Sequence, residues 1–271
     1  IRTSESSLLA TAAKKGDEAM PGFLLVPFSA LLLVSASLCA ASDYAREKRW
    51  ESEITPGIVV GDAEYLVQNN GHKFLGIYTE AANARMGVVV VHGIGVHPDW
   101  GMIGTLRQRL PDYGYATLSI QMPILAADAR PEAYAATFPE AVERLQLAFA
   151  YLANKRHRRI ALVSHSMGSR MAHAYMAANS SAISAWAALG MTAPPGNSDA
   201  ARTYERINTP VLDLYGARDL PQVLASAARR YLSLAGNKQS KQVQISAADH
   251  FFAGREDEMV KAVKIFLDGV K

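Results

Sequence analysis

From residue 88 onward, short runs rich in β-branched residues alternate with longer stretches that have the apolar periodicity of a helix. The expected strands are residues 88–91, 115–120, 159–163, 183–189, 210–215 and 242–246. The expected helices are residues 101–110, 138–155, 168–178, 222–234 and 256–270. Strand followed by helix, repeated along one chain, predicts a mostly parallel sheet. The run at 88–91 consists of four valines, which is typical of a central strand that helices cover on both faces.

The chain ahead of this alternation divides into a hairpin and a charged stretch. Residues 64–78 are expected to form two strands around Asn69-Asn70-Gly71, a sequence typical of a hairpin turn. Residues 46–53 are charged, and we expect a linker or a surface helix there. With 271 residues, 49% of them hydrophobic, the chain is long enough to bury a substantial core and too short for two comfortable domains. We therefore predict one domain at 61–271, preceded by a linker at 42–60.

An uncharged apolar run at residues 23–41 sets the N-terminal segment apart from the rest. It is short for a membrane-spanning helix, contains Pro27, and ends with Cys39 and Ala41 at the −3 and −1 positions of a signal-peptidase site. We expect residues 1–41 to be an extension with a signal peptide that is removed, which gives a periplasmic or secreted protein. The alternative is an uncleaved membrane anchor, and membrane association is expected only through this segment.

The charged and metal-binding residue types argue against several classes of partner. The formal net charge is +3, and the basic residues are spread along the chain without a basic-aromatic tract, so nucleic acid is not an expected partner. The seven histidines lack HExxH spacing, and the single cysteine cannot form a cysteine pair. We expect neither a metal nor a cofactor.

The sequence Ser164-His165-Ser166-Met167-Gly168 joins an expected strand to an expected helix. A sharp turn that presents a nucleophilic serine needs small residues two positions before and two after it, because a larger side chain would clash with neighbouring elements. Ser164 and Gly168 meet this need for Ser166, although Ser164 stands where glycine is usual. The pattern predicts a nucleophilic Ser166. The alternative interpretation is a serine that caps an ordinary helix.

The valine strand ends in His92-Gly93-Ile94-Gly95, a loop that can direct a backbone N–H toward a developing oxyanion. Together with the N–H of Met167, the N–H of Ile94 would form an oxyanion hole with two donors. We interpret His92 as a structural histidine that hydrogen-bonds its own loop. His97 and Trp100 follow at once and are expected to line the rim of a substrate site. Plain turn formation, with Trp100 packed as a lid on the core, is the alternative.

Two later strands end in residues that would complete a catalytic triad. Asp219 follows a glycine turn after its strand, whereas Asp213 lies in mid-strand, too far inside to orient a histidine. His250 follows the last expected strand, and the adjacent Asp249 is better placed to cap a loop or helix. Serine, aspartate and histidine therefore occur in the order Ser166, Asp219, His250, each after a strand.

From about residue 61 to its end, the chain resembles the α/β-hydrolase superfamily. The resemblance rests on His92-Gly93, Ser164-x-Ser166-x-Gly168, Gly216-x-x-Asp219 and His250. The loop from His92 to Trp100 is similar, more narrowly, to a bacterial envelope α/β-hydrolase family. The resemblance implies the α/β-hydrolase fold, with helices on both faces of a mostly parallel sheet, and an esterase-like, lipase-like or peptidase-like activity.

These motifs together predict a serine hydrolase that acts on a carboxylic ester or a related acyl substrate through an acyl-enzyme. The partner is then a small-molecule acyl or lipid-like substrate. Residues 191–208 form a short connection, which leaves room for a small cap or none. A non-catalytic envelope protein that keeps the fold and uses its crevice for binding is the alternative, since a fold does not fix a function.

Overall fold

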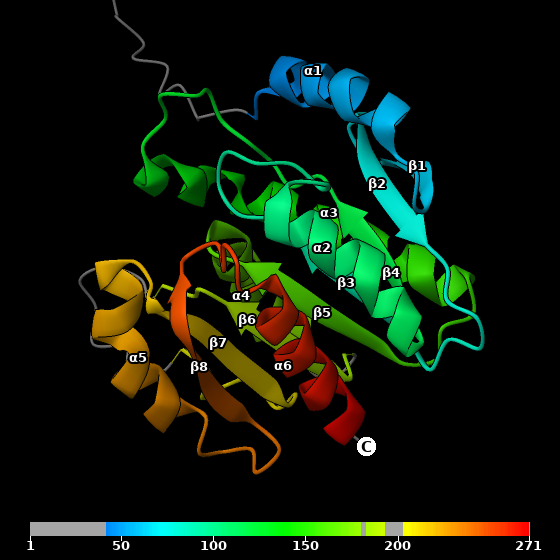
Figure 1. Ribbon diagram of the computed structural model, residues 1–271. Helices are drawn as coiled ribbons and strands as arrows, with labels where there is room; N and C mark the ends of the chain where they lie inside the picture. The colour runs from blue at the N-terminus through cyan, green and yellow to red at the C-terminus, as the bar shows by residue number, and fades with distance from the viewer. Residues whose placement is uncertain (1–41, 180–182, 193–202, 271) are drawn as a thin grey trace, which may run out of the picture. The chain divides into compact units, whose positions relative to one another are not determined.

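The computed structural model describes residues 42–179, 183–192 and 203–270. One eight-stranded sheet runs through them in the order β1-β2-β4-β3-β5-β6-β7-β8 (Figure 1). Its strands are β1 (Asp62–Val67), β2 (Lys73–Thr79), β3 (Met86–Val91), β4 (Tyr115–Ile120), β5 (Ile160–His165), β6 (Ala185–Leu189), β7 (Val211–Arg218) and β8 (Lys241–Asp249). β2 pairs antiparallel with β1 and with β4, and every other neighbouring pair is parallel. The prediction of a mostly parallel sheet is confirmed.

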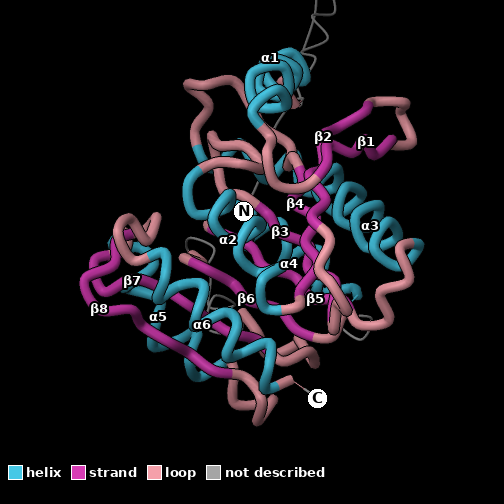
Figure 2. Tube along the Cα trace, turned by 45° about the vertical axis from the view of Figure 1, so that its right-hand side comes forward, coloured by secondary structure: helices cyan, strands magenta, loops and turns pink. Residues whose placement is uncertain are grey.

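Helices cover both faces of this sheet (Figures 1 and 2). They are α1 (Tyr44–Ile54), α2 (Gly101–Arg109), α3 (Phe138–Asn154), α4 (Met167–Asn179), α5 (Pro221–Ser233) and α6 (Glu256–Gly269), with short 3-10 turns at η1 (Thr55–Gly57), η2 (Leu110–Tyr113) and η3 (Pro131–Thr137). Buried side chains of α3 and α4 share one hydrophobic cluster, and those of α2 and α6 share another. The sheet therefore separates two cores.

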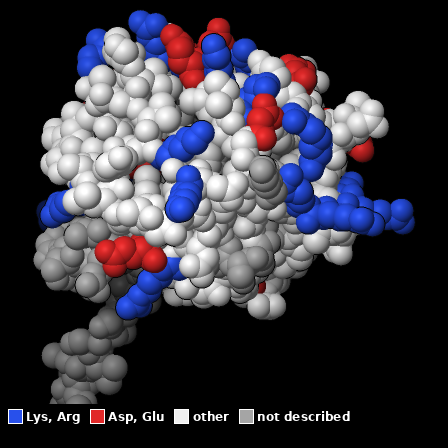
Figure 3. Space-filling view, turned by 90° about the horizontal axis from the view of Figure 1, so that it is seen from below, with Lys and Arg blue, Asp and Glu red and all other residues white. Residues whose placement is uncertain are grey.

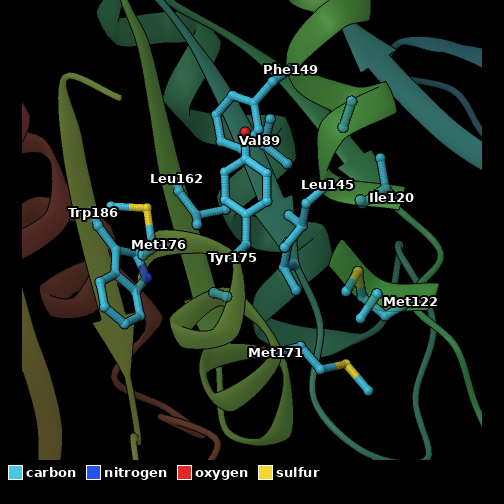
Figure 4. Close-up of a cluster of buried hydrophobic side chains, with 14 of the residues drawn as sticks. Val89, Ile120, Met122, Leu145, Phe149, Leu162, Met171, Tyr175, Met176 and Trp186 are labelled. Carbon is cyan, nitrogen blue, oxygen red and sulfur yellow. The ribbon is translucent and has the colours of Figure 1, made fainter. Parts of the chain in front are cut away.

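The valines of β3 show how one strand serves both cores. Val89 and Val91 belong to the cluster with α3 and α4, whereas Val88 and Val90 belong to the cluster with α2 and α6. Successive side chains of a strand point to opposite faces, so a strand buried on both sides must be apolar at every position. Figure 4 shows Val89 among the side chains of the first cluster.

Strands β7 and β8 extend beyond their predicted ends at residues 215 and 246, and this extension determines where Asp219 and His250 lie. β7 continues to Arg218 and β8 to Asp249 because the two strands go on pairing past an irregularity between Gly216 and Arg218. As a result, Asp219 and His250 follow their strands directly. The predicted hairpin before β3 is also confirmed, with Gly71 in its turn at a φ of 83°.

The segment expected to be a linker or a surface helix forms a helix, α1, which is held against the domain. Glu47 is 4% exposed, and its Oε2 lies 3.1 Å from Nη1 of Arg144, whose side chain is fully buried in α3. The N–H of Asp43 and the guanidinium of Arg46 donate to the carbonyls of Ile124 and Leu125, at 2.7 Å and 2.9 Å. The charged composition of α1 does not indicate that the helix packs on the domain, because the charged side chains that hold α1 face the domain and not the solvent.

The expected signal peptide or anchor at residues 1–41 lies outside the described residues, as do residues 193–202 of the expected short connection. None of the described helices combines the length and the apolar character that a bilayer crossing requires. On the face seen in Figure 3, basic and acidic side chains lie next to one another along the upper edge, and uncharged surface makes up much of the rest.

Candidate active site

Ser166, His250 and Asp219 come together at the carboxyl ends of β5, β8 and β7. Ser166 Oγ lies 2.9 Å from His250 Nε2, and His250 Nδ1 lies 2.6 Å from Asp219 Oδ1. A carboxylate only accepts hydrogen bonds, so Nδ1 carries the imidazole proton and Nε2 is left to accept the serine hydroxyl. This is the geometry of a serine whose proton can pass to a histidine that is oriented by a carboxylate.

The turn at Ser166 is sharp and sterically demanding. Ser166 has a φ of 53°, a left-handed conformation that non-glycine residues rarely adopt. Its N–H donates to the carbonyl of Leu189 at 2.9 Å, which fixes the turn to the end of β6. At Gly168, a Cβ atom would lie 2.2 Å from the carbonyl oxygen of His92, so only glycine fits there. The structure thus gives Ser166 the strained strand-to-helix turn that the sequence predicts.

Ser164, which stands where the pattern usually has glycine, is integrated into the core. Its Oγ accepts a hydrogen bond from Trp186 Nε1 at 2.8 Å and lies 3.0 Å from Ser169 Oγ. Ser164, Ser169 and Trp186 are all fully buried. The hydroxyl therefore satisfies an indole N–H that would otherwise be buried without a partner, and the departure from glycine has a structural role.

Asp219 is buried and remains ionised because both of its carboxylate oxygens accept hydrogen bonds. Burial by itself raises the pKa of this carboxyl, but the hydrogen bond and the charge of His250 lower it, and so do the N–H groups of Leu220 and Gly216. Their combined effect holds the pKa of Asp219 below its usual value. The backbone N–H groups donate at 2.7 Å and 3.2 Å. A carboxylate that stays charged can orient and stabilise an imidazolium.

His92 orients the loop at residues 92–95, which contains the predicted oxyanion donor Ile94. Its Nε2 accepts the N–H of Met122 at 2.9 Å, so Nδ1 carries the proton and donates to the carbonyl of Gly93 at 2.8 Å. The peptide that joins Gly93 to Ile94 is planar and trans, so fixing its carbonyl on one side turns the N–H of Ile94 to the other. Burial lowers the pKa of His92 to about 3, which keeps it neutral. The geometry matches the structural role predicted for His92.

Met167 begins α4, so its N–H has no acceptor within the helix. The turn at Ser166 lies against the loop at residues 92–95, since a Cβ atom at Gly93 would be 3.0 Å from the Cβ of Ser166. The predicted donors Ile94 and Met167 therefore lie on two segments that meet at Ser166.

The two expected rim residues have different surroundings. Trp100 lies edge-on to Phe251, with 5.1 Å between ring centroids, and Phe251 lies at the same distance from His250. His97 instead lies beside Trp50 of α1, at 5.7 Å between ring centroids. Its Nδ1 accepts the N–H of Asp99 at 3.3 Å. Trp100 is thus connected to the triad, and His97 connects the loop to α1.

The competing aspartates have structural partners. Asp213 is fully buried and paired with Arg230, whose Nε lies 3.0 Å from both carboxylate oxygens. Asp249 Oδ1 accepts the N–H groups of Phe251 and Ala253, each at 3.0 Å, and so fixes the loop after β8. Among the residues described, no group of three or more histidine, cysteine, aspartate or glutamate side chains could hold a metal ion.

Sequence analysis did not single out His165 or Phe251. The ring of His165 is buried 4.7 Å from that of His250, and its Nε2 lies 2.9 Å from the His250 carbonyl oxygen. Its place beside the predicted nucleophile is the only sequence signal, and that signal does not reveal contact with the end of β8. Phe251 directly follows the predicted His250, and this position alone does not show where its ring lies.

Comparisons with known proteins place this arrangement in context. Residues 60–143 match a family model described as "Protein of unknown function (DUF3530)". No curated protein matches the chain significantly. Among solved structures, Est1E from Butyrivibrio proteoclasticus is similar, with a TM-score of 0.60 and 17% identity over 76% of this chain and 98% of that one.

Two further solved structures show the same level of similarity. A dienelactone hydrolase from Anabaena variabilis has a TM-score of 0.61 and 20% identity, over 77% of this chain and 96% of that one. XC6422 from Xanthomonas campestris, described as an α/β serine hydrolase without a lid, has a TM-score of 0.59 and 13% identity, over 78% and 95%. At these identities the similarity concerns the fold.

Proposed function

We propose that this chain, which has the predicted α/β-hydrolase fold, is a serine hydrolase that cleaves a carboxylic ester or a related acyl substrate. The observation that carries the proposal is the continuous hydrogen-bonded line from Ser166 through His250 to Asp219, with Ser166 held at a positive φ. Strain of this kind persists only where the surrounding structure enforces it, and it is concentrated at functional sites. The neighbours described as esterases and hydrolases support the same reaction class.

The first half of the reaction forms the acyl-enzyme. Ser166 Oγ attacks the carbonyl carbon while its proton passes to His250 Nε2, and the carbonyl oxygen becomes an oxyanion. His250 then returns this proton to the leaving oxygen as the bond between that oxygen and the acyl carbon breaks. Asp219 keeps the proton on Nδ1 and stabilises the imidazolium between the two steps.

The second half uses water in place of the alcohol. His250 Nε2 accepts a proton from water, whose oxygen attacks the acyl carbon, and the protonated histidine returns the proton to Ser166 Oγ as the acyl group leaves. In both halves, the N–H groups of Ile94 and Met167 would hold the oxyanion. Loss of one such donor typically costs about 3–4 kcal/mol of transition-state stabilisation.

A fluorophosphonate probe tests the nucleophile directly. The full chain is incubated with the probe beside Ser166→Ala, and both proteins are then given a series of p-nitrophenyl esters of increasing acyl length. Ser52→Ala is the matched control, because Ser52 is exposed on α1. Labelling and turnover lost in Ser166→Ala and kept in Ser52→Ala would support the proposal. A folded wild type that neither labels nor turns over any ester would instead support the alternative, a non-catalytic protein that uses its crevice for binding.

The location proposed for the enzyme is the bacterial envelope, in the periplasm or outside the cell. The support is the uncharged run at residues 23–41 and its small residues at Cys39 and Ala41. An uncleaved anchor would keep the same domain at a membrane surface. N-terminal sequencing of the protein isolated from cells separates the two, because only cleavage gives a new terminus at Ser42.

A further inference from the structure

Phe251 places a large apolar ring at the edge of the triad. Its side chain is 43% exposed, although its immediate neighbours His250 and Phe252 are buried. Its ring lies 5.1 Å from that of His250 and 5.1 Å from that of Trp100, in edge-to-face arrangements of 69° and 71°. An aromatic ring left partly in water beside reacting groups can bind an apolar part of a ligand.

The backbone holds Phe251 in this place before any ligand binds. Asp249 Oδ1 accepts the N–H groups of Phe251 and Ala253, and Phe252 fills the core behind them at a φ of 55°. The ring of His165 also lies beside Phe251, with 5.8 Å between ring centroids. Little conformational freedom is left for a ligand to restrict, which favours binding.

Trp100 is fixed just as firmly on the opposite loop. Its N–H donates to the carbonyl of His97 at 3.1 Å, and its own carbonyl accepts from Ile103 at 2.9 Å in the first turn of α2. The preceding Asp99 is paired with the buried guanidinium of Arg107 at 2.5 Å. Phe251 and Trp100 therefore form a preformed aromatic edge between the loop after β8 and the loop after β3.

The position of this edge identifies the part of the substrate that it meets. His250 Nε2 must protonate the leaving oxygen, so the alcohol portion of an ester lies near His250 during acylation. The acyl carbonyl points instead toward the N–H groups of Ile94 and Met167. A ring packed against His250 therefore borders the alcohol portion.

We propose that Phe251 and Trp100 bind the alcohol portion of the substrate and select esters of uncharged alcohols that carry a ring, such as benzyl esters. This inference rests on the proposed function. A ring in the alcohol could add edge-to-face contacts of the kind that Phe251 and Trp100 already make with each other. Phe251 and Trp100 carry no charge, so a charged group placed against the two rings would lose water without gaining an ionic partner.

The test compares benzyl acetate with methyl acetate, which share an acyl group and have alkoxide leaving groups. The ratio of kcat/KM for the two esters is measured for the full-length wild type, Phe251→Ala and Phe251→Leu. Ile265→Ala is the control, because Ile265 is 53% exposed on the later part of α6. Acetate esters of 4-carboxybenzyl alcohol test the preference for an uncharged ring. Fluorophosphonate labelling is followed in every variant.

We expect the wild type to prefer benzyl acetate over both other esters. The benzyl-to-methyl ratio should fall about 2- to 10-fold in Phe251→Ala, which is the range for loss of an aromatic pair, and less in Phe251→Leu. It should not change in Ile265→Ala. An unchanged ratio in a Phe251→Ala protein that still labels overturns this inference and leaves the serine hydrolase standing. A wild type without labelling or turnover overturns both.

Discussion

His165 donates its Nε2–H to the backbone carbonyl of His250, with 2.9 Å between nitrogen and oxygen. The direction of this bond is fixed because a carbonyl only accepts. The residue before Ser166, the proposed nucleophile, thereby holds the backbone of His250, the histidine proposed to activate it. Two segments that are 85 positions apart are tied at the point where Ser166 and His250 must meet.

A pair of substitutions tests this positioning role. Glutamine can place its amide donor near the Nε2 position of histidine, whereas asparagine places its donor near Nδ1. We expect His165→Asn to lower kcat for ester hydrolysis by up to about 100-fold, since small misplacements of reacting groups have effects of this size. His165→Gln should recover most of kcat, with KM little changed in both. Equal losses in the two variants, at equal stability, would contradict the role.

Acid should destabilise the protein through the same histidine. Burial and the neighbouring His250 lower the pKa of His165 to about 3, so the folded chain leaves it neutral while the unfolded chain protonates it below about pH 6.5. The stability this group contributes is complete above pH 6.5 and is lost as the pH falls toward 3. From pH 6 to pH 5, wild type should lose about 1 kcal/mol more unfolding free energy than His165→Gln. Urea titrations at both pH values measure the difference, and equal losses would show that His165 titrates normally.

Local sequence patterns predicted much of this fold, because the periodicities of strands and helices can be recognised within short stretches of the chain. The alternation of strands and helices predicted the mostly parallel sheet, and the positions of Ser166, Asp219 and His250 after strands predicted that the three side chains lie together. What local patterns missed depends on long-range contacts. Glu47 holds α1 through Arg144, 97 positions away, and nothing in a charged stretch indicates which carboxylate will be buried.

The same limit applies to Phe251 and to Ser164. An aromatic residue after a catalytic histidine can be core or rim, and only the packing of the loop after β3 against the loop after β8 decides which. Ser164 appeared as a departure from a glycine pattern until Trp186, on the neighbouring strand, supplied the donor for its hydroxyl. The sequence predicted that Ser166, Asp219 and His250 lie together, but it did not indicate the residues elsewhere in the chain that support them.

The Ser164–Trp186 hydrogen bond should stabilise the turn at Ser166. Ser164→Ala leaves the buried indole N–H of Trp186 without this acceptor, which we expect to cost about 1–3 kcal/mol of unfolding free energy. In the Trp186→Phe background there is no N–H to satisfy, so the same change should cost less. Urea unfolding of the wild type, both single variants and the double variant gives the coupling. A coupling energy near zero would mean that the bond contributes nothing to stability.

Asp219→Asn should separate the orientation of His250 from the rest of the site. Asparagine keeps the size of the side chain but loses the negative charge that fixes the proton on Nδ1. We expect kcat to fall about 10³- to 10⁴-fold, with stability changed far less. Asp112→Asn, at an exposed position in η2, is the control. Because the pKa of Asp219 is lowered, its ionisation should not limit wild-type activity until the pH is below the usual range for aspartate. Wild-type-like turnover in Asp219→Asn would remove Asp219 from the triad.

Gly190 follows β6 and leaves the space in which the imidazole of His250 lies. A Cβ atom there would be 2.9 Å from His250 Cε1 and 3.0 Å from Nδ1, and the φ of Gly190 is 55°. Gly190→Ala should therefore displace the ring from Ser166 and Asp219 and lower kcat by about 100-fold. The left-handed backbone adds a stability cost of about 1–2 kcal/mol. Gly57→Ala is the matched control, because no atom lies within 4 Å of a Cβ built there. If Gly190→Ala loses stability but keeps its kcat, the ring can shift without consequence, and close packing against Gly190 does not set the geometry of the triad.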